Sequence, residues 1–303
     1  MGNRVSTGVR LSVVLAFATV YIVWGTTYLA IRFGIETIPV FLMAGVRFIV
    51  GGALFYQWAS GRADETPNPE HWKSAFIIGG LMVACGIGGV TWTEQFVPSG
   101  LTALMIAIVP FWIILMDWLR PGGSSPSGAV VFGLVMGFIG LGLLINPGEI
   151  GGVSEIDPRG AGAILFATLC WSTGSIYSRH APQPRFHPLA VGMQMMCGGL
   201  ILLIVSLAIG ELSQFKMATL SLRSVMAVVY LIGPGSIAYA MYLFLLKAST
   251  PAKAATYTYV NPIIALIVGA WLGGEVMSNW TVACSAVIIL GVVVTITAKM
   301  QVK

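Results

Sequence analysis

Long apolar runs constrain this chain more than any other feature. A helix that crosses a membrane needs ~20 mostly apolar residues, and runs of this length follow one another along the 303 residues, separated by short polar connections. Only 9% of the residues are charged and 57% are hydrophobic, whereas a soluble domain carries about 25% charged residues. One soluble core cannot bury this much apolar surface, so we expect lipid to surround most of the chain.

Ten ranges meet the length requirement and are predicted to cross the membrane as helices. They are 11–31, 39–58, 74–93, 98–119, 128–146, 160–178, 188–210, 223–246, 252–274 and 279–298. None of the runs has the ~10-residue alternating pattern of a membrane β-strand. The predicted fold class is therefore an all-α polytopic membrane protein with ten transmembrane helices.

The distribution of Lys and Arg predicts the orientation, because short cytoplasmic connections carry an excess of both. With both termini in the cytoplasm, 11 of the 16 Lys and Arg residues fall on the inner side, 4 on the outer side and Arg47 within a span. This bias favours an even number of spans with both ends inside. The net charge of +5 does not indicate a nucleic-acid partner.

The two halves of the sequence resemble each other in order. WGTTYLAIR from Trp24 matches WSTGSIYSR from Trp171, and Pro110 matches Pro262 farther along. Five spans in each half is an odd number, so the second half must enter the membrane upside down. We therefore expect one membrane domain of two inverted five-helix repeats, 1–149 and 150–303, an architecture typical of alternating-access transporters.

Several motifs together resemble a known family. WGTTYLAIR, PVFLMAGVRFIVGG, the VP and NP pairs and WLGGE are similar to the EamA-type branch of the drug/metabolite transporter superfamily, and closest in look to its aromatic amino acid exporters. The resemblance covers nearly the whole chain. It implies a ten-helix carrier of the cell inner membrane that exports amino acids or related metabolites, with both termini cytoplasmic.

Aromatic and hydroxyl side chains share one face of the first span. Tyr21, Trp24 and Tyr28 are spaced i, i+3 and i+7, and Trp171 and Ser175 hold matching positions in the second half. Such rings either line a cavity or serve packing and interface anchoring. We favour a cavity, because Trp24 and Trp171 lie about two-thirds of the way along their spans in polar company. Stacking area without fixed charge suits a zwitterion with an apolar side chain.

The spans with prolines supply the second group of candidates. Pro110 and Pro262 are expected to break their helices and to take part in gating, since a proline removes a backbone hydrogen bond in mid-membrane. A kink used only for packing is the alternative. The complete set of expected substrate-binding residues is Tyr21, Trp24, Tyr28, Thr102, Met105, Trp171, Ser175, Tyr239, Tyr257 and Asn261.

Charged residues inside the spans are scarce. Glu94 is a candidate coupling site, which leaves proton-coupled and facilitated transport both open. Arg47 is expected to reach the polar interface or pair with a helix end, with a gating contact as the alternative. The cysteines and histidines form no metal-binding pattern, so we expect neither metal nor cofactor.

Three function classes compete. The leading hypothesis is a carrier, expected to work as a monomer, that exports neutral or aromatic amino acids. Efflux of drugs or cations is the second hypothesis, although the spans lack a buried carboxylate to meet a cation. A phosphate-sugar carrier would need basic residues that face a central cavity, and among the residues within the spans only Arg47 is a candidate. A polytopic membrane enzyme is distant, because no catalytic constellation is present.

Overall fold

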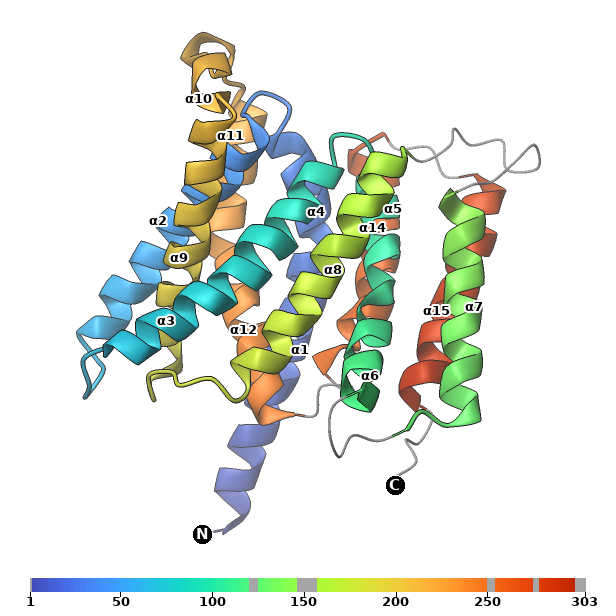
Figure 1. Cartoon of the computed structure of the whole chain (residues 1–303), viewed down its shortest axis with the longest axis horizontal. Helices are drawn as coiled ribbons and strands as arrows, with labels where there is room; N and C mark the ends of the chain where they lie inside the picture. Colours follow the sequence, from blue (N-terminus) through green and yellow to red (C-terminus); the bar gives the residue numbers. More distant parts are fainter. Residues whose placement is uncertain (1, 120–124, 146–156, 250–253, 275–277, 298–303) are drawn as a thin grey trace.

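The computed structural model describes residues 2–119, 125–145, 157–249, 254–274 and 278–297. Its regular elements are helices, and most cross the molecule side by side (Figure 1). Up to residue 145 they are α1 (Gly2–Gly34), α2 (Val40–Ser60), α3 (Pro69–Ile78), η1 (Gly79–Ile87), α4 (Gly88–Thr93), α5 (Ser99–Met105), η2 (Ile106–Ile108), α6 (Val109–Leu119) and α7 (Gly128–Ile145). The boundary expected between the repeats, at 149 and 150, lies outside the described residues.

The second half continues the same pattern of long helices joined by short connections. Its elements are α8 (Pro158–Ser178), α9 (His187–Ala208), α10 (Glu211–Gln214), η4 (Met217–Thr219), α11 (Leu222–Tyr230), η5 (Leu231–Gly235), α12 (Ser236–Ala248), α14 (Tyr257–Leu272) and α15 (Asn279–Thr297). The start of α1 and the end of α15 lie at the same side of the molecule (Figure 1).

Each range expected to span the membrane contains a helix or a run of helices. Within the described residues, six stretches are long and apolar enough to cross a membrane: Leu11–Gly34, Val40–Ser60, Pro69–Thr93, Ser99–Met116, His187–Ala208 and Leu222–Ala248. Three shorter apolar stretches are Gly128–Gly137, Val260–Leu272 and Asn279–Gly291. Helix α8 belongs to neither group, because its glycines and hydroxyls lower its mean hydropathy. The number of ten crossings stays a prediction.

Regular α-helical bonding is interrupted at three internal points. The segments η1 and η5 are π-helical, and η2 is a 3-10 turn that ends two residues before Pro110. Helix α14, in contrast, runs unbroken through Pro262. Its irregular turn lies earlier, at residues 255 and 256. Because α14 begins only five residues before Pro262, the proline removes a hydrogen bond near the helix start and leaves the remainder intact.

Two helix pairs pack backbone against backbone at glycines, one at each end of the molecule (Figure 1). In the α2–α9 pair, a Cβ on Gly52 would lie 2.8 Å from Met196 N, and one on Gly192 would lie 2.6 Å from Tyr56 N. In the α7–α15 pair, a Cβ on Gly291 would lie 2.6 Å from a backbone oxygen. Only glycine permits these approaches, and the central helices α1, α8, α12 and α14 lie between the two pairs.

A carboxylate from the second half caps the first turn of α2. The Glu211 carboxylate of α10 accepts hydrogen bonds from Phe41 N at 3.1 Å and Leu42 N at 2.8 Å. Glu211 is 7% exposed. On the other side, the Glu65 carboxylate accepts a hydrogen bond from Arg185 N, just before α9. Glu211 therefore satisfies two unpaired donors at the start of α2, and Glu65 holds the connection that leads into α9.

Candidate functional site

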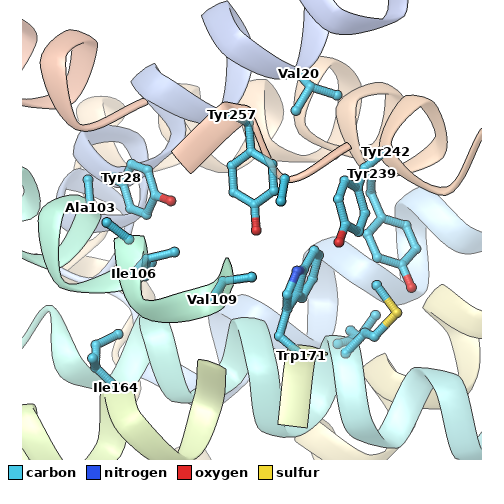
Figure 2. Packing of buried hydrophobic residues seen from close by; sticks show 14 of the residues in the cluster. Val20, Tyr28, Ala103, Ile106, Val109, Ile164, Trp171, Tyr239, Tyr242 and Tyr257 are labelled. Atoms are coloured by element: carbon cyan, nitrogen blue, oxygen red, sulfur yellow. The ribbon is translucent and has the colours of Figure 1, made fainter. Parts of the chain in front are cut away.

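Four aromatic side chains meet at the centre of the helix bundle and form the aromatic cluster: Trp24, Trp171, Tyr242 and Tyr257. The Trp24 ring of α1 lies 5.4 Å from Trp171 of α8, 5.0 Å from Tyr242 of α12 and 5.1 Å from Tyr257 of α14, centroid to centroid. These tilted and edge-on geometries favour aromatic contacts. Figure 2 shows Trp171, Tyr239 and Tyr257 converging on one space from different helices. Both halves of the chain thus contribute to one cluster.

A cavity of about 80 Å³, here called the central cavity, lies beside the aromatic cluster. Its walls are mostly apolar and aromatic with a few polar groups, as is usual for small-molecule sites. The lining residues are Trp24, Thr27, Tyr28, Ile31, Arg47, Phe48, Gly86, Ile87, Val90, Ile106, Val109, Ala167, Thr168, Trp171, Gly235, Tyr239 and Tyr257. None of these described lining residues is acidic, and Arg47 is the one basic residue among them.

The central cavity occupies one half of the molecule. On α1 its lining runs from Trp24 to Ile31, near the C-terminal end of that helix. On the other side of Trp24, the Tyr21 and Thr256 hydroxyls share a hydrogen bond of 2.5 Å that joins α1 to the turn before α14. Trp24 and this hydrogen bond therefore separate the cavity from the side where α1 begins.

Arg47 lies on the cavity wall, within α2. It is only 4% exposed, and its guanidinium carbon lies 4.5 Å above the centroid of the Phe48 ring. Among the described residues, nothing accepts a hydrogen bond from its buried Nε atom. The fully buried Glu94 acts electrostatically on both Arg47 and Tyr28. Glu94 is the residue at which α4 ends, so pairing with a helix end stays a prediction for Arg47, as does reaching the polar interface.

Trp171 presents a second buried donor at the cavity. It is 7% exposed, and within the described part of the chain its indole Nε1 makes no hydrogen bond of regular geometry, although it interacts with the hydroxyls of Tyr242 and Tyr257. A neighbouring polar group is already occupied, because Thr168 Oγ1 accepts a hydrogen bond from Trp112 Nε1 at 3.1 Å. Thr168 also donates to the carbonyl of Ile164 one turn back.

The structure brings half of the expected binding residues to the cavity wall. Trp24, Tyr28, Trp171, Tyr239 and Tyr257 all line it. All five are aromatic. Tyr28, Trp171, Tyr239 and Tyr257 are buried, and Trp24 is partly buried. Their role in substrate binding stays a prediction.

Ser175, Tyr21 and Asn261 lie outside the lining and connect helices. The Ser175 hydroxyl lies 3.0 Å from the Tyr242 hydroxyl. The hydrogen-bond network orients the Asn261 amide so that its nitrogen donates to the backbone oxygens of Tyr257 and Tyr21, each at 3.2 Å. These bonds tie α14 to α1 beside the aromatic cluster.

The other expected residues also lie off the cavity wall. Thr102 and Met105 are fully buried in α5, and neither proline belongs to the lining. Glu94 follows α4, where its backbone oxygen accepts a hydrogen bond from Arg32 Nη1 at 3.0 Å. The parts these residues play in binding, gating and coupling stay predictions.

A wall from η1 and α4 was not expected from the sequence. Gly86, Ile87 and Val90 line the cavity, and a Cβ on Gly86 would lie 3.2 Å from the Trp171 ring. The proximity of Gly86 to Trp171 depends on the packing of η1 against α8, for which no local pattern gives a signal.

Long apolar helices around a mostly apolar cavity with a few polar groups are typical of a membrane transport protein. The described residues contain no group of three or more His, Cys, Asp or Glu that could hold a metal ion. The model of the EamA-like transporter family matches the chain twice, over residues 11–146 and 158–297. The chain belongs to this family, and its membership indicates a transporter and not an enzyme.

Curated relatives cover most of the chain. The uncharacterized inner membrane transporter YedA of Escherichia coli is 35% identical over 287 residues, which is 94% of this chain and 90% of that protein. The uncharacterized transporter YvbV of Bacillus subtilis is 24% identical, covering 85% of this chain and 82% of that protein. A crystal structure of a protein 22% identical in sequence superposes with a TM-score of 0.66, covering 94% of this chain and 97% of the other. That likeness shows a shared fold.

Proposed function

We propose that this protein is an alternating-access carrier of the inner membrane that exports small amphipathic metabolites, neutral or aromatic amino acids foremost. The observation that carries the proposal is the contact between Trp24 and Trp171, whose rings lie 5.4 Å apart beside the central cavity. The two are counterparts in the proposed repeats. A residue touches its own counterpart only near the axis that relates two repeats, and carriers of this architecture bind substrate there.

Several observations support the inverted repeat. The family model matches once in each half, and α1 and α8 run in opposite directions (Figure 1). The two π-helical segments begin at Gly79 and Leu231, which are separated by the same 152 residues as the two prolines. Contacts repeat as well, since Gly52 approaches Gly192 and their counterparts Gly199 and Gly45 approach each other.

The position of the cavity supports alternating access. With the start of α1 in the cytoplasm, the central cavity lies in the outer half of the membrane. Trp24, Trp171 and the hydrogen bond between Tyr21 and Thr256 close it on the inner side. Passage then requires the contacts between α1, α8 and α14 to open, while the glycine-packed α2–α9 and α7–α15 pairs hold together. Residues of one chain line the cavity on several sides, which supports a monomeric carrier.

The cavity wall favours amphipathic organic molecules. Aromatic rings supply stacking area, and each good aromatic contact contributes roughly 0.5–1.5 kcal/mol beyond burial. Efflux of cationic drugs ranks second, because the described lining contains no carboxylate to neutralise a buried cation.

Flux through purified protein in liposomes tests the proposal. Vesicles that contain the protein and are loaded with unlabelled phenylalanine or leucine should take up the labelled amino acid, and vesicles without the protein should not. A quaternary ammonium dye in parallel vesicles serves as the competing substrate class. Flux of the dye without flux of any neutral amino acid would replace the leading proposal with the cation-efflux function.

The coupling mechanism is tested in the same vesicles. We propose facilitated exchange, with Glu94 as the coupling residue if protons take part. A pH gradient of either sign should leave the initial exchange rate unchanged. A rate that follows the gradient in wild type but not in Glu94→Gln would establish proton coupling through Glu94.

A further inference from the structure

We propose that Arg47 binds a carboxylate of the transported molecule, so that the recognised class is organic carboxylates with an aromatic or apolar body. Amino acids are then one subset of this class, and the amine is dispensable. The inference rests on the proposed function, namely that the central cavity is the transport site.

The state of Arg47 is the first argument. Its side chain is buried on the cavity wall and stacked on Phe48, and its Nε atom meets no acceptor among the described residues. A buried charged group without hydrogen bonds is costly, and native structures satisfy nearly all such groups. A planar guanidinium offers two parallel donors that match the two oxygens of a carboxylate. The cavity beside it gives such a group room to enter.

Trp171 supplies the second argument independently. Its buried Nε1 makes no hydrogen bond of regular geometry within the described residues, although it interacts with the Tyr242 and Tyr257 hydroxyls, and it lies on the wall of the same cavity. The two buried polar atoms of this wall that make no regular hydrogen bond within the described residues, Arg47 Nε and Trp171 Nε1, are therefore both donors. A ligand that satisfies them must bring acceptors, which a carboxylate does and an ammonium group does not.

The wall connecting the two donors suits the body of such a molecule. Phe48 lies 6.5 Å from Tyr239, and Tyr239 lies 6.3 Å from Trp171, centroid to centroid. This line of rings offers apolar area between the two donors. An organic phosphate would carry a second negative charge, for which the described lining provides no second basic side chain. A monoanionic carboxylate fits the charge of the wall better.

Three probes that share one ring separate the two recognised groups. They are labelled L-phenylalanine, 3-phenylpropanoate, which lacks the amine, and 2-phenylethylamine, which lacks the carboxylate. We expect unlabelled 3-phenylpropanoate to compete with phenylalanine exchange, and 2-phenylethylamine to compete at least about ten-fold less well, as expected when a charged hydrogen bond is lost. Equal competition by the amine, or stronger competition by phenyl phosphate, would overturn the assignment.

Substitutions at the two donors test their roles. Arg47→Met should weaken competition by 3-phenylpropanoate by about ten-fold or more. Arg47→Lys should retain part of the competition, because lysine supplies the positive charge but not the two parallel N–H donors of the guanidinium. Trp171→Phe keeps an aromatic ring but removes the N–H donor, and should weaken competition by 3-phenylpropanoate by a smaller factor than Arg47→Met does. Arg62→Gln is the matched control, since Arg62 is exposed beyond the end of α2, and it should behave as wild type.

Binding in detergent separates this inference from the proposed function. The thermal unfolding midpoint of purified protein should rise with 3-phenylpropanoate and not with 2-phenylethylamine, and Arg47→Met should lose this rise. If no probe crosses the membrane but this selectivity holds, transport of these compounds fails and the carboxylate site stands. If wild type and Arg47→Met respond equally, the carboxylate assignment is wrong even where transport is observed.

Discussion

At the residue scale, Trp24 makes the central contacts of the site. Its ring touches three other rings from three other helices, at centroid distances from 5.0 to 5.4 Å. It also forms part of the cavity wall. A single side chain thus joins the packing of the bundle to the space where a substrate is proposed to bind.

Shortening Trp24 should therefore impair transport more than it impairs folding. We expect Trp24→Ala to lower amino acid exchange by about ten-fold or more, and Trp24→Phe to have an intermediate effect, because each ring contact contributes roughly 0.5–1.5 kcal/mol. Exchange rates normalised to folded protein give the measurement. Trp271→Ala is the control, since Trp271 is 81% exposed; equal losses in both variants would contradict a specific role for Trp24.

The residues recognised from sequence were those with a local pattern. Trp24 and Tyr28 share a helical face, and Trp171 follows from the repeat, so spacing alone places them together. Arg47 was visible as the deepest basic residue, but which wall it faces depends on how α2 rotates against its neighbours. Gly86 was not identified from the sequence, because the residue it contacts, Trp171, lies 85 positions away.

At the element scale, helix positions follow from hydropathy, whereas departures from regular bonding do not. Segment η5 contains Pro234, which removes a backbone hydrogen bond and marks the irregularity in the sequence, whereas the π-helical segment η1 contains no proline. Pro262 shows the reverse case. It predicts a break, but α14 begins so close to it that the helix remains continuous.

The α2–α9 contact predicts a sharp effect at Gly192. A Cβ there would lie 2.6 Å from Tyr56 N and 2.9 Å from Gly52 O, both backbone atoms that cannot move alone. We expect Gly192→Ala to destabilise the fold by roughly 1–3 kcal/mol through overpacking, measured as a lower unfolding midpoint. Gly162→Ala is the control, since a Cβ there meets nothing within 4 Å; a larger loss at Gly162 would contradict the packing account.

The cap that Glu211 of the second half provides at the start of α2 predicts a second effect on stability. Glu211→Ala removes the acceptor of two backbone N–H groups and should cost ~1 kcal/mol, the usual value of a helix cap. Thermal unfolding in detergent measures it. The exposed Asp64→Ala substitution should leave the midpoint unchanged, and an equal effect there would show that Glu211 acts only through net charge.

At the scale of the whole molecule, the two halves meet in three ways. Their glycine-packed helix pairs lie at the two ends (Figure 1), carboxylates of each half accept backbone hydrogen bonds from the other, and their tryptophans touch in the middle. Sequence repetition predicts such pairing, but the position of the cavity on one side of Trp24 is one arrangement of the packing, which sequence does not select. The central claim is that a second arrangement opens the cavity to the other side.

Accessibility of one cysteine in the cavity tests this claim most directly. Thr27→Cys, in a protein whose four native cysteines are replaced by alanine, places one thiol on the cavity wall. In oriented liposomes with exchange under way, a membrane-impermeant thiol reagent should modify it when added to either side, and substrate should slow both reactions. Modification from one side only, while exchange continues at the wild-type rate, would contradict alternating access through this cavity.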